Sequence, residues 1–238
     1  MITLAVILPC YNEEACIPLS AKKLEAKMEA LSIQGLISKE SRLLFVDDGS
    51  HDASWKEISE LHNSKPELYS GLKLSRNEGH QYALLAGLEY AYTRFDAAIT
   101  IDVDLQDDIN AIDEMLVKFN AGNDIVYGVR SSRKSDTPFK RQSAQGYYAL
   151  MKGLGVELVP EAADFRLMSK RAIGALLRYQ ENNLFLRGLV PQLGFKSDTV
   201  SYERLPREAG KSKYPFKKML ALGWNGISSF SSVPLTLL

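Results

Sequence analysis

Several residue types and patterns are scarce or absent in this 238-residue chain, and each absence argues against a class of protein. There are two cysteines, Cys10 and Cys16, with no CxxC pair, so we expect reduced thiols, as in the cytosol, and no zinc site. No run of about 18 apolar residues occurs, so no segment is predicted to span a bilayer. Lysine plus arginine equals aspartate plus glutamate at 29 each, so no overall charge attracts nucleic acid.

The short motifs of several enzyme classes are also missing. The first predicted strand is followed neither by GxGxxG nor by a Walker A loop, which argues against dinucleotide-binding and P-loop proteins. There is no GxSxG nucleophile elbow and no HExxH. The histidines are not spaced as a metal set: we expect His51 and His62 at the surface, and keep His80, at a predicted helix start, as a candidate site residue.

What is present is an alternation of short apolar runs with amphipathic stretches, which predicts βαβ units and a doubly wound, mostly parallel α/β sheet. The apolar N-terminus lacks a basic region and a cleavage site, and is read as a strand. The predicted strands cover residues 2–8, 42–47, 70–75, 97–102 and 124–129, and the helices 13–31, 52–63, 80–94 and 109–121. Beyond residue 130 we expect a helix at 142–153, a strand leading into a helix within 161–177, and a strand within 196–204.

Four predicted strands end in polar sequence, at the edge where open α/β sheets bind ligands. After the first strand, Tyr11 and Glu13 are candidates to contact a nucleotide base and ribose; alternatively, Asn12 caps the next helix, with Glu13 in its first turn. After the second, Asp48 is a ribose candidate, or part of a turn with Gly49. Agreement among several segments favours a ligand site at this edge.

The segment DVDLQDD (102–108) is the sharpest of these signals. In an extended chain, Asp102 and Asp104 lie on one face, and two carboxylates suit Mg²⁺ or Mn²⁺ shared with a diphosphate. The alternative is an acid-rich turn, with Asp107 or Asp108 capping the helix 109–121, and for Asp108 we expect the cap.

Two basic segments, 130–141 and 204–218, are the remaining candidates. A charged run is most often a solvated face, but arginines after a strand at the site edge also suit phosphate binding. The second segment leads into an amphipathic stretch, which is typical of a membrane-surface helix.

Seven stretches occur in one order: ILPCYNEE, FVDDGSHD, LSRNEGHQYALLAGL, TIDVDLQD, ADFRLMSKRA, LFLRGLVPQLGF and RLPREAGKSKYPFKKML. With them, essentially the whole chain resembles a family 2 glycosyltransferase of the GT-A fold, and most of all the polyprenyl-phosphate glycosyltransferases, relatives of dolichol-phosphate mannose synthase. The resemblance implies a Rossmann-like sheet flanked by helices, with a C-terminal amphipathic helix at the membrane interface. The QxxRW motif of processive polysaccharide synthases is absent, which argues against a chain-elongating enzyme.

The resemblance also implies site residues. Asp102 and Asp104 would form a DxD motif that holds Mg²⁺ or Mn²⁺ and the donor diphosphate, with Gln106 near the metal or the sugar. Residues expected at the nucleotide-sugar are Pro9, Tyr11, Asn12, Glu13, Asp48, Asn77, Gly79, His80 and Asp102, with Arg204, Lys211, Lys213 and Tyr214 closing over donor or acceptor phosphates. Residues expected toward the acceptor are Arg130 and Arg133, which gather its phosphate, and Asp164 and Arg166.

The implied reaction is an inverting transfer of a sugar, UDP-glucose being the first guess for the donor, to a polyprenyl phosphate. We expect a catalytic domain at 1–210, with a nucleotide-binding half (1–130) and an acceptor-side half (131–210), and a juxtamembrane segment at 211–238 cut short before transmembrane helices or docking by its last helix. The expected location is the cytoplasmic face of the cell membrane, although this piece alone could be soluble, and a homo-oligomer stays open. Alternatives are transfer to a sugar hydroxyl with Asp164 as base, a nucleotidyltransferase, and a non-catalytic sugar-nucleotide-binding module.

Overall fold

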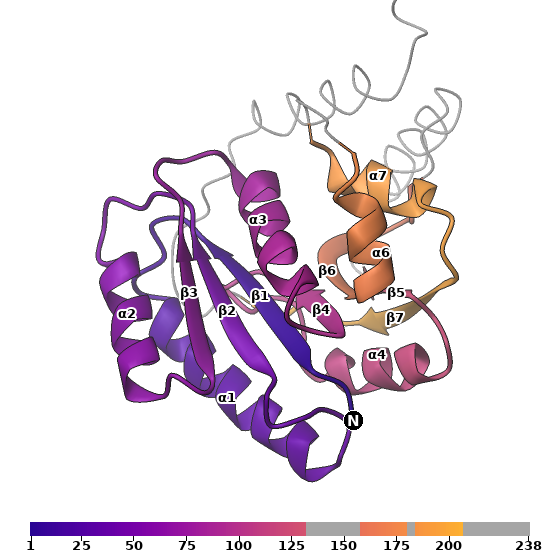
Figure 1. Ribbon diagram of the computed structural model, residues 1–238, viewed down its shortest axis with the longest axis horizontal. Helices are drawn as coiled ribbons and strands as arrows, with labels where there is room; N and C mark the ends of the chain where they lie inside the picture. Colours follow the sequence, from indigo (N-terminus) through magenta and orange to yellow (C-terminus); the bar gives the residue numbers. More distant parts are fainter. Residues whose placement is uncertain (132–157, 180–183, 207–238) are drawn as a thin grey trace, which may run out of the picture.

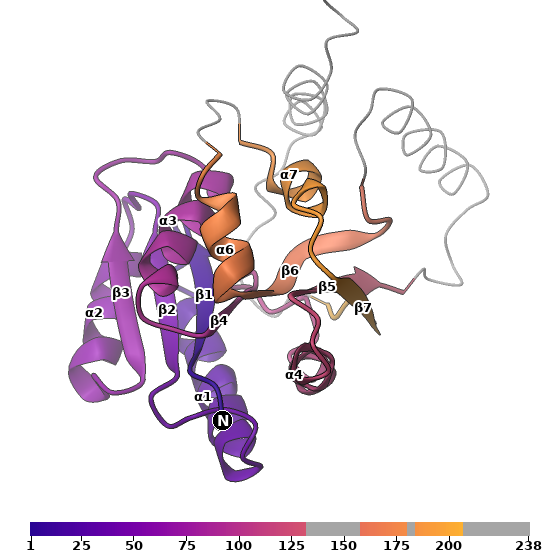
Figure 2. The same ribbon diagram turned by 45° about the vertical axis from the view of Figure 1, so that its right-hand side comes forward.

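The computed structural model describes residues 1–131, 158–179 and 184–206, which form one seven-stranded sheet with helices on both faces (Figures 1 and 2). The strands lie in the order β3-β2-β1-β4-β6-β5-β7. The strands are β1 (Leu4–Cys10), β2 (Arg42–Asp47), β3 (Tyr69–Lys73), β4 (Ala97–Thr100), β5 (Ile125–Arg130), β6 (Ala162–Ser169) and β7 (Ser197–Tyr202). The helices are α1 (Ile17–Ile33), α2 (Ser54–Ser64), α3 (His80–Tyr92), α4 (Ala111–Asn120), α6 (Lys170–Leu176) and α7 (Leu186–Gln192).

Within the described ranges, β6 is the one strand that runs against the others. It pairs antiparallel with β4 on one side and with β5 on the other, whereas β1, β2, β3 and β4 pair in parallel, as do β5 and β7. The α/β fold with a mostly parallel sheet is therefore confirmed. Because β6 is reversed, its first residues lie at the edge where the other strands end.

The sheet is covered on both faces, and this explains the apolar strands. Helices α1, α2 and α4 pack on one face, and α3, α6 and α7 on the other (Figure 2). Strand β1 is buried along its whole length. Val6 packs in the core under α1, α2 and α4, and Ile7 packs in the core under α3, α6 and α7. A strand buried on both faces needs apolar residues at every position, so LAVIL reads as a continuous run rather than an alternation.

Two expected element boundaries are wrong. Helix α1 begins at Ile17 with Cys16 as its N-cap, so Asn12 does not cap it and Glu13 is outside its first turn. A proline at the first or second helical position fits this later start, because its missing N–H needs no partner there. Helix α4 has Asn110 as its N-cap; Asp108 accepts a hydrogen bond from the Asn110 N–H at 2.9 Å and so closes the turn before the helix.

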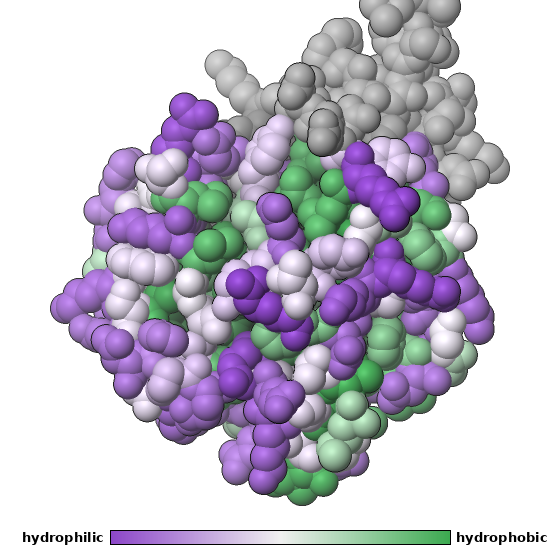
Figure 3. Space-filling model, in the orientation of Figure 1, coloured by the Kyte–Doolittle hydropathy of each residue, from purple (hydrophilic) through white to green (hydrophobic). Residues whose placement is uncertain are grey.

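The surface in the view of Figure 1 is mostly hydrophilic, with smaller hydrophobic groups between (Figure 3). None of the helices in the described ranges is long and apolar enough to cross a membrane. The predicted helix at 142–153 and the predicted segment at 211–238 lie outside the described residues. The division of the chain into halves at residue 130 stays a prediction, and strands from both halves share one sheet.

Candidate active site at the carboxyl edge of the sheet

The loops after β1 and β2 are joined by hydrogen bonds between side chains and backbone. Asn12, with a positive φ of 52°, donates its N–H to Ser50 Oγ at 2.8 Å, and its Oδ1 accepts from the His51 N–H at 2.8 Å. The Glu13 N–H donates to Ser54 Oγ, also at 2.8 Å. Two residues expected at the donor, Asn12 and Glu13, are thus fixed by the loop that carries a third and by the first residue of α2.

That third residue, Asp48, ties the loop after β2 to the loop after β3. Its Oδ1 accepts from the Glu78 N–H at 2.8 Å, and its Oδ2 from the Gly79 N–H at 2.9 Å. Burial raises the pKa of Asp48, and these two hydrogen bonds oppose the rise. The approach of the two loops requires glycine at 49, where φ is 67° and a Cβ would lie 2.4 Å from the carbonyl carbon of Arg76. Asp48 thus holds together the two loops on the side where the donor is expected. Its direct contact with a nucleotide stays a prediction.

The acidic segment after β4 is a turn and not the extended chain that we expected. Leu105, with φ of 44°, donates its N–H to the carbonyl oxygen of Asp102 at 3.1 Å. Burial nevertheless alternates: Ile101, Val103 and Leu105 are buried, whereas Asp102 and Asp104 are partly exposed. The apolar side chains anchor the turn in the core, so the two acids remain accessible at the edge of the sheet.

This pair of carboxylates suits a divalent cation, both in the type of ligand atom and in the electrostatic environment. The pKa of Asp102 is raised, because the surrounding protein removes part of the water around its carboxylate; His80 opposes the rise, and the charges of Asp107, Asp164 and Asp104 add to it. A cation would relieve such crowding. No three histidine, cysteine or acidic side chains in the described ranges group closely enough to hold an ion by themselves. Mg²⁺ and Mn²⁺ fit this arrangement, because they bind one or two carboxylates and take their remaining ligands from water and phosphates.

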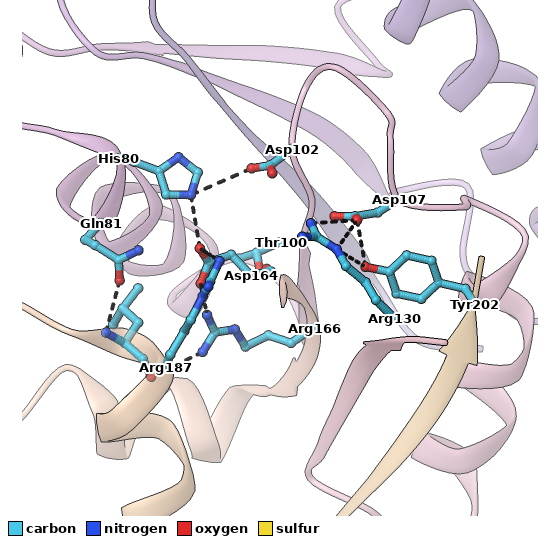
Figure 4. A network of polar contacts seen from close by, with 11 residues as sticks. His80, Gln81, Thr100, Asp102, Asp107, Arg130, Asp164, Arg166, Arg187 and Tyr202 are labelled. Atoms are coloured by element: carbon cyan, nitrogen blue, oxygen red, sulfur yellow. Dashed lines mark hydrogen bonds and ion pairs between the residues drawn. The ribbon is translucent and has the colours of Figure 1, made fainter. Parts of the chain in front are cut away.

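His80, the first residue of α3, lies between two acids from distant segments (Figure 4). Its Nε2 is 3.4 Å from Asp164 Oδ2 and 3.7 Å from Asp102 Oδ1. Burial lowers the pKa of His80, but the hydrogen bond to Asp164 and both negative charges outweigh it, so the net direction is upward. The structure therefore brings together three predicted site residues, from the start of α3, the turn after β4 and strand β6.

Asp164, near the start of β6, is saturated with cationic partners. Arg166 Nη2 donates to its Oδ1 at 2.6 Å; Arg187 donates through Nε to Oδ1 at 3.3 Å and through Nη2 to Oδ2 at 3.1 Å (Figure 4). Burial alone would raise the pKa of Asp164, but Arg187, the His80 hydrogen bond and Arg166 hold it well below its usual range. The carboxylate is therefore a fixed anion and a poor proton acceptor.

Arg187 is a site residue that the sequence reasoning missed. It follows Leu186 in the first turn of α7, where Leu186 is fixed by Gln81 Oε1, which accepts from its N–H at 3.0 Å, and by Arg166 Nη1, which donates to its carbonyl oxygen at 3.3 Å. The available signal was a single arginine within the otherwise apolar stretch LFLRGLV. The pairing with Asp164 depends on the sheet order and could not be read from spacing.

A second ionic cluster stands beside the first and joins Asp107, Arg130 and Tyr202 (Figure 4). Asp107 Oδ1 accepts from Arg130 Nε at 3.2 Å and Nη2 at 3.0 Å, and from the Tyr202 hydroxyl at 2.6 Å. Burial lowers the pKa of Arg130, but Asp107 and Tyr202 outweigh it and raise the pKa. Arg130, predicted for the acceptor phosphate, is therefore already paired with an acid, and Asp107 is a partner of Arg130 rather than a helix cap.

Gln106 and Arg204, two further predicted site residues, contact each other. Arg204 Nη2 donates to Gln106 Oε1 at 2.6 Å, and the Gln106 carbonyl oxygen accepts from the Leu205 N–H at 2.8 Å. The Gln106 N–H in turn donates to Asp104 Oδ1 at 3.2 Å. The segment that follows β7 is thus attached directly to the acidic turn.

The other predicted site residues are placed less informatively or not at all. Tyr11 is partly buried in the loop after β1. Pro9 is inside β1, opposite Val46, and Asn77 is exposed in the loop after β3. Four lie outside the described residues: Arg133, Lys211, Lys213 and Tyr214.

Comparison with known proteins identifies the family. The model of glycosyl transferase family 2 matches residues 5–189. The chain belongs to this family. It is 50% identical over 98% of its length to an uncharacterized glycosyltransferase of Bacillus subtilis, YkoT, covering 68% of that protein. It is 38% identical, again over 98% of its length, to the bactoprenol glucosyl transferase of Shigella phage SfV, covering 73% of it.

A solved structure agrees on the fold. Glucosyl-3-phosphoglycerate synthase from Mycobacterium tuberculosis, in complex with Mn²⁺, UDP-glucose and phosphoglyceric acid, matches with a TM-score of 0.54, covering 96% of this chain and 78% of that one. At 18% identity this likeness shows the GT-A fold alone. The predicted family, fold and class of activity are confirmed: this protein is a glycosyltransferase.

Proposed function

We propose that this glycosyltransferase moves a hexosyl group, with glucose the first candidate, from a uridine diphosphate sugar to the phosphate of a polyprenyl lipid, using Mg²⁺ or Mn²⁺. An oxygen of the lipid phosphate would bond to the anomeric carbon as the bond from that carbon to the nucleotide breaks, and UDP would leave with the electron pair. In-line attack inverts the centre, so an α-linked donor would give a β-linked product.

The observation that carries this proposal is that both carboxylate oxygens of Asp164 already have cationic partners. An enzyme that activates a sugar hydroxyl needs a general base, and Asp164 was the residue considered for that role. Asp164 is 7% exposed, and its two carboxylate oxygens face Arg166, Arg187 and His80. A lipid phosphate is already largely ionised near pH 7 and requires positioning and charge neutralisation instead of a base. The absence of a free base at Asp164 therefore favours a phosphate acceptor.

The relatives support the same acceptor. Proteins named bactoprenol glucosyl transferase from Shigella phage SfV and Shigella flexneri are each 38% identical to this chain over 98% of its length. Bactoprenol is a polyprenyl lipid, and glucose is the sugar that these names specify. Both fit a membrane-associated enzyme at the cytoplasmic face of the cell membrane, where UDP-glucose and the lipid phosphate would meet.

The donor side of the proposal rests on the acidic turn and the joined loops. Asp102 and Asp104 would hold the cation, which when bound supplies charge neutralisation for the departing diphosphate. The loops that carry Asn12, Glu13 and Asp48 are fastened together by their own hydrogen bonds. A nucleotide would therefore meet a surface formed in advance, which reduces the ordering cost of binding.

The test is transfer of radiolabel from a panel of sugar nucleotides into butanol-extractable product. Membranes from cells that express the protein are supplied with undecaprenyl phosphate and Mg²⁺ or Mn²⁺, with EDTA as the control. Metal-dependent label in butanol, from UDP-glucose above the other donors, is expected. Label confined to the aqueous phase with UDP still released would move the acceptor to a hydroxyl and refute the proposal.

One variant tests the use of the acceptor separately from the binding of the donor. Arg133→Ala, in the basic segment outside the described residues, should raise the KM for the lipid phosphate at least several-fold and leave donor binding unchanged. A loss of UDP binding with unchanged use of the lipid would contradict the role of this segment.

A further inference from the structure

The cluster of Asp107, Arg130 and Tyr202 connects the acidic turn to β5 and β7, and apart from the predicted contact of Arg130 with the acceptor phosphate it has no assigned role in transfer. Asp107 is 1% exposed, and its Oδ1 accepts all three hydrogen bonds from Arg130 and Tyr202. Its Oδ2 is buried without a hydrogen-bond partner among the described residues. Such an oxygen carries a desolvation cost, so the carboxylate is not optimised for stability alone.

Stability alone is a weak explanation of an ion pair in which one partner, Asp107, is buried. Replacing such a pair with apolar residues of similar volume is commonly neutral or stabilising, whereas a charged pair fixes the relative position of the segments that carry it. The segments here are the acidic turn, the end of β5 and the end of β7. Arg130 and Tyr202 are direct partners in the parallel β5–β7 register, so their side chains leave one rigid ladder toward Asp107.

The position of Tyr202 is fixed from its other side as well. Its ring meets Phe165 of β6 edge-on, at 5.4 Å between centroids and an interplanar angle of 74°. Its carbonyl oxygen accepts from the Ser131 N–H at 2.9 Å and from Ser131 Oγ at 3.1 Å. The hydroxyl is therefore presented to Asp107 from a preorganised strand.

The cluster reaches Asp104 through one residue. Asp107 fixes the chain next to Gln106, whose carbonyl oxygen and side chain are fixed by Leu205 and Arg204. The Gln106 N–H donates to Asp104 Oδ1 at 3.2 Å and so sets the direction of that carboxylate. An error in the placement of this backbone would turn Asp104 away from any shared cation.

We propose that Asp107, anchored by Arg130 and Tyr202, is a positioning residue that holds Asp104 in the orientation needed to bind the divalent cation. The inference rests on the metal-binding part of the proposed function and is independent of the acceptor. It also assigns to Arg130 a role in which its guanidinium serves the acidic turn and not only a phosphate.

The test measures Mn²⁺ binding directly, by the loss of the free Mn²⁺ signal in electron paramagnetic resonance, with and without UDP. Since partners beyond the metal ligands commonly contribute 10- to 100-fold to affinity, we expect Asp107→Asn to raise the Mn²⁺ dissociation constant about tenfold and Tyr202→Phe about threefold. The double variant should lose less than the product of the two single effects, because the hydroxyl and the carboxylate act on the same turn.

The chain offers a matched control for each change. Tyr69 is a buried tyrosine whose hydroxyl donates to Glu25 Oε2 at 2.6 Å, so Tyr69→Phe removes an equal bond away from the turn. Asp124 is a buried acid held by Ser169 and Arg171 at the opposite end of β5, so Asp124→Asn is the control for Asp107→Asn. Both controls should lower the melting temperature and leave Mn²⁺ affinity unchanged.

Wild-type Mn²⁺ affinity in folded Asp107→Asn and Tyr202→Phe would overturn the inference and leave the cluster a purely structural feature. If Asp107→Asn does not fold, the comparison of Tyr202→Phe with Tyr69→Phe decides alone. A wild-type protein that binds no Mn²⁺ with or without UDP would also overturn it. Because Mn²⁺ binding is read without any transfer, a failure to label the butanol phase refutes the acceptor and leaves this measurement intact.

Discussion

Replacing Arg187 by glutamine tests the ionic partners on which the argument about Asp164 depends. The change removes two hydrogen bonds to the buried carboxylate, at 3.1 and 3.3 Å, and a full positive charge. Removing one partner of a fully buried pair costs about 3–5 kcal/mol. The side chain of Arg187 is 40% exposed, however, and Arg166 and His80 remain beside Asp164, so we expect a loss of about 1–2 kcal/mol.

For a chain of this length, that loss corresponds to a fall of about 2–8 °C in melting temperature, followed by circular dichroism and by urea unfolding at pH 7. The control is Arg76→Gln, which removes an arginine from an exposed pair with Glu78, and no measurable fall is expected there. An Arg187→Gln protein as stable as the wild type would mean that the guanidinium does not pair with Asp164 in solution. Asp164 would then lack its principal cationic partner and could serve as a general base.

Three further changes are predicted. Asp104→Asn should raise the Mn²⁺ dissociation constant at least tenfold in the same resonance titration, and an unchanged value would remove this residue from the metal site. Gly49→Ala should lower the free energy of unfolding by about 3 kcal/mol, because the strain of a positive φ and the overlap of the new Cβ with backbone atoms add. Gly35 also has a positive φ but open space around it, so Gly35→Ala should cost only about 1 kcal/mol. Equal losses in urea unfolding would contradict the overlap at Gly49. Arg171 lowers the pKa of Asp124, so the ion pair stabilises the fold above the ordinary aspartate pKa range and ceases to do so as the pH falls through the pKa of the folded state. The difference in unfolding free energy between wild type and Asp124→Asn, about 1 kcal/mol at pH 7, should therefore shrink toward pH 3. A difference that stays constant with pH would refute the ionic assignment.

The part of the fold that depends on local pattern was predictable. Strand β2 has the predicted bounds, and the predicted starts of β3, β5 and α3 differ from the observed ones by at most one residue, because apolar runs bounded by polar turns are local signals. The antiparallel direction of β6 and its insertion between β4 and β5 were not predicted. Strand direction is decided by the route of the connections, about which the residues of ADFRLMS carry no information.

The residues of the candidate site likewise divide into those that the sequence indicated and those whose role depends on tertiary contacts. His80 and Asp102 were selected from local context and Asp164 from the family resemblance, and the structure brings the three together. Their cationic partner Arg187 was missed, because its relevance depends on a contact between α7 and β6. For Asp107 the sequence offered a helix cap as one alternative, because its partner Tyr202 lies far along the chain and leaves no local motif.

The insertion of β6 has a consequence for biosynthesis. Strands β3, β2, β1 and β4 are neighbours in the sheet and are complete once residue 100 has left the ribosome. Strand β5 is made next but has no neighbour until β6 and β7 follow, because β6 separates it from β4. A nascent chain therefore carries the apolar segment IVYGV with two unpaired edges for an interval, a state open to association with other chains. Translational pauses or truncations between residues 130 and 162 would prolong that exposure, whereas those after residue 202 would not.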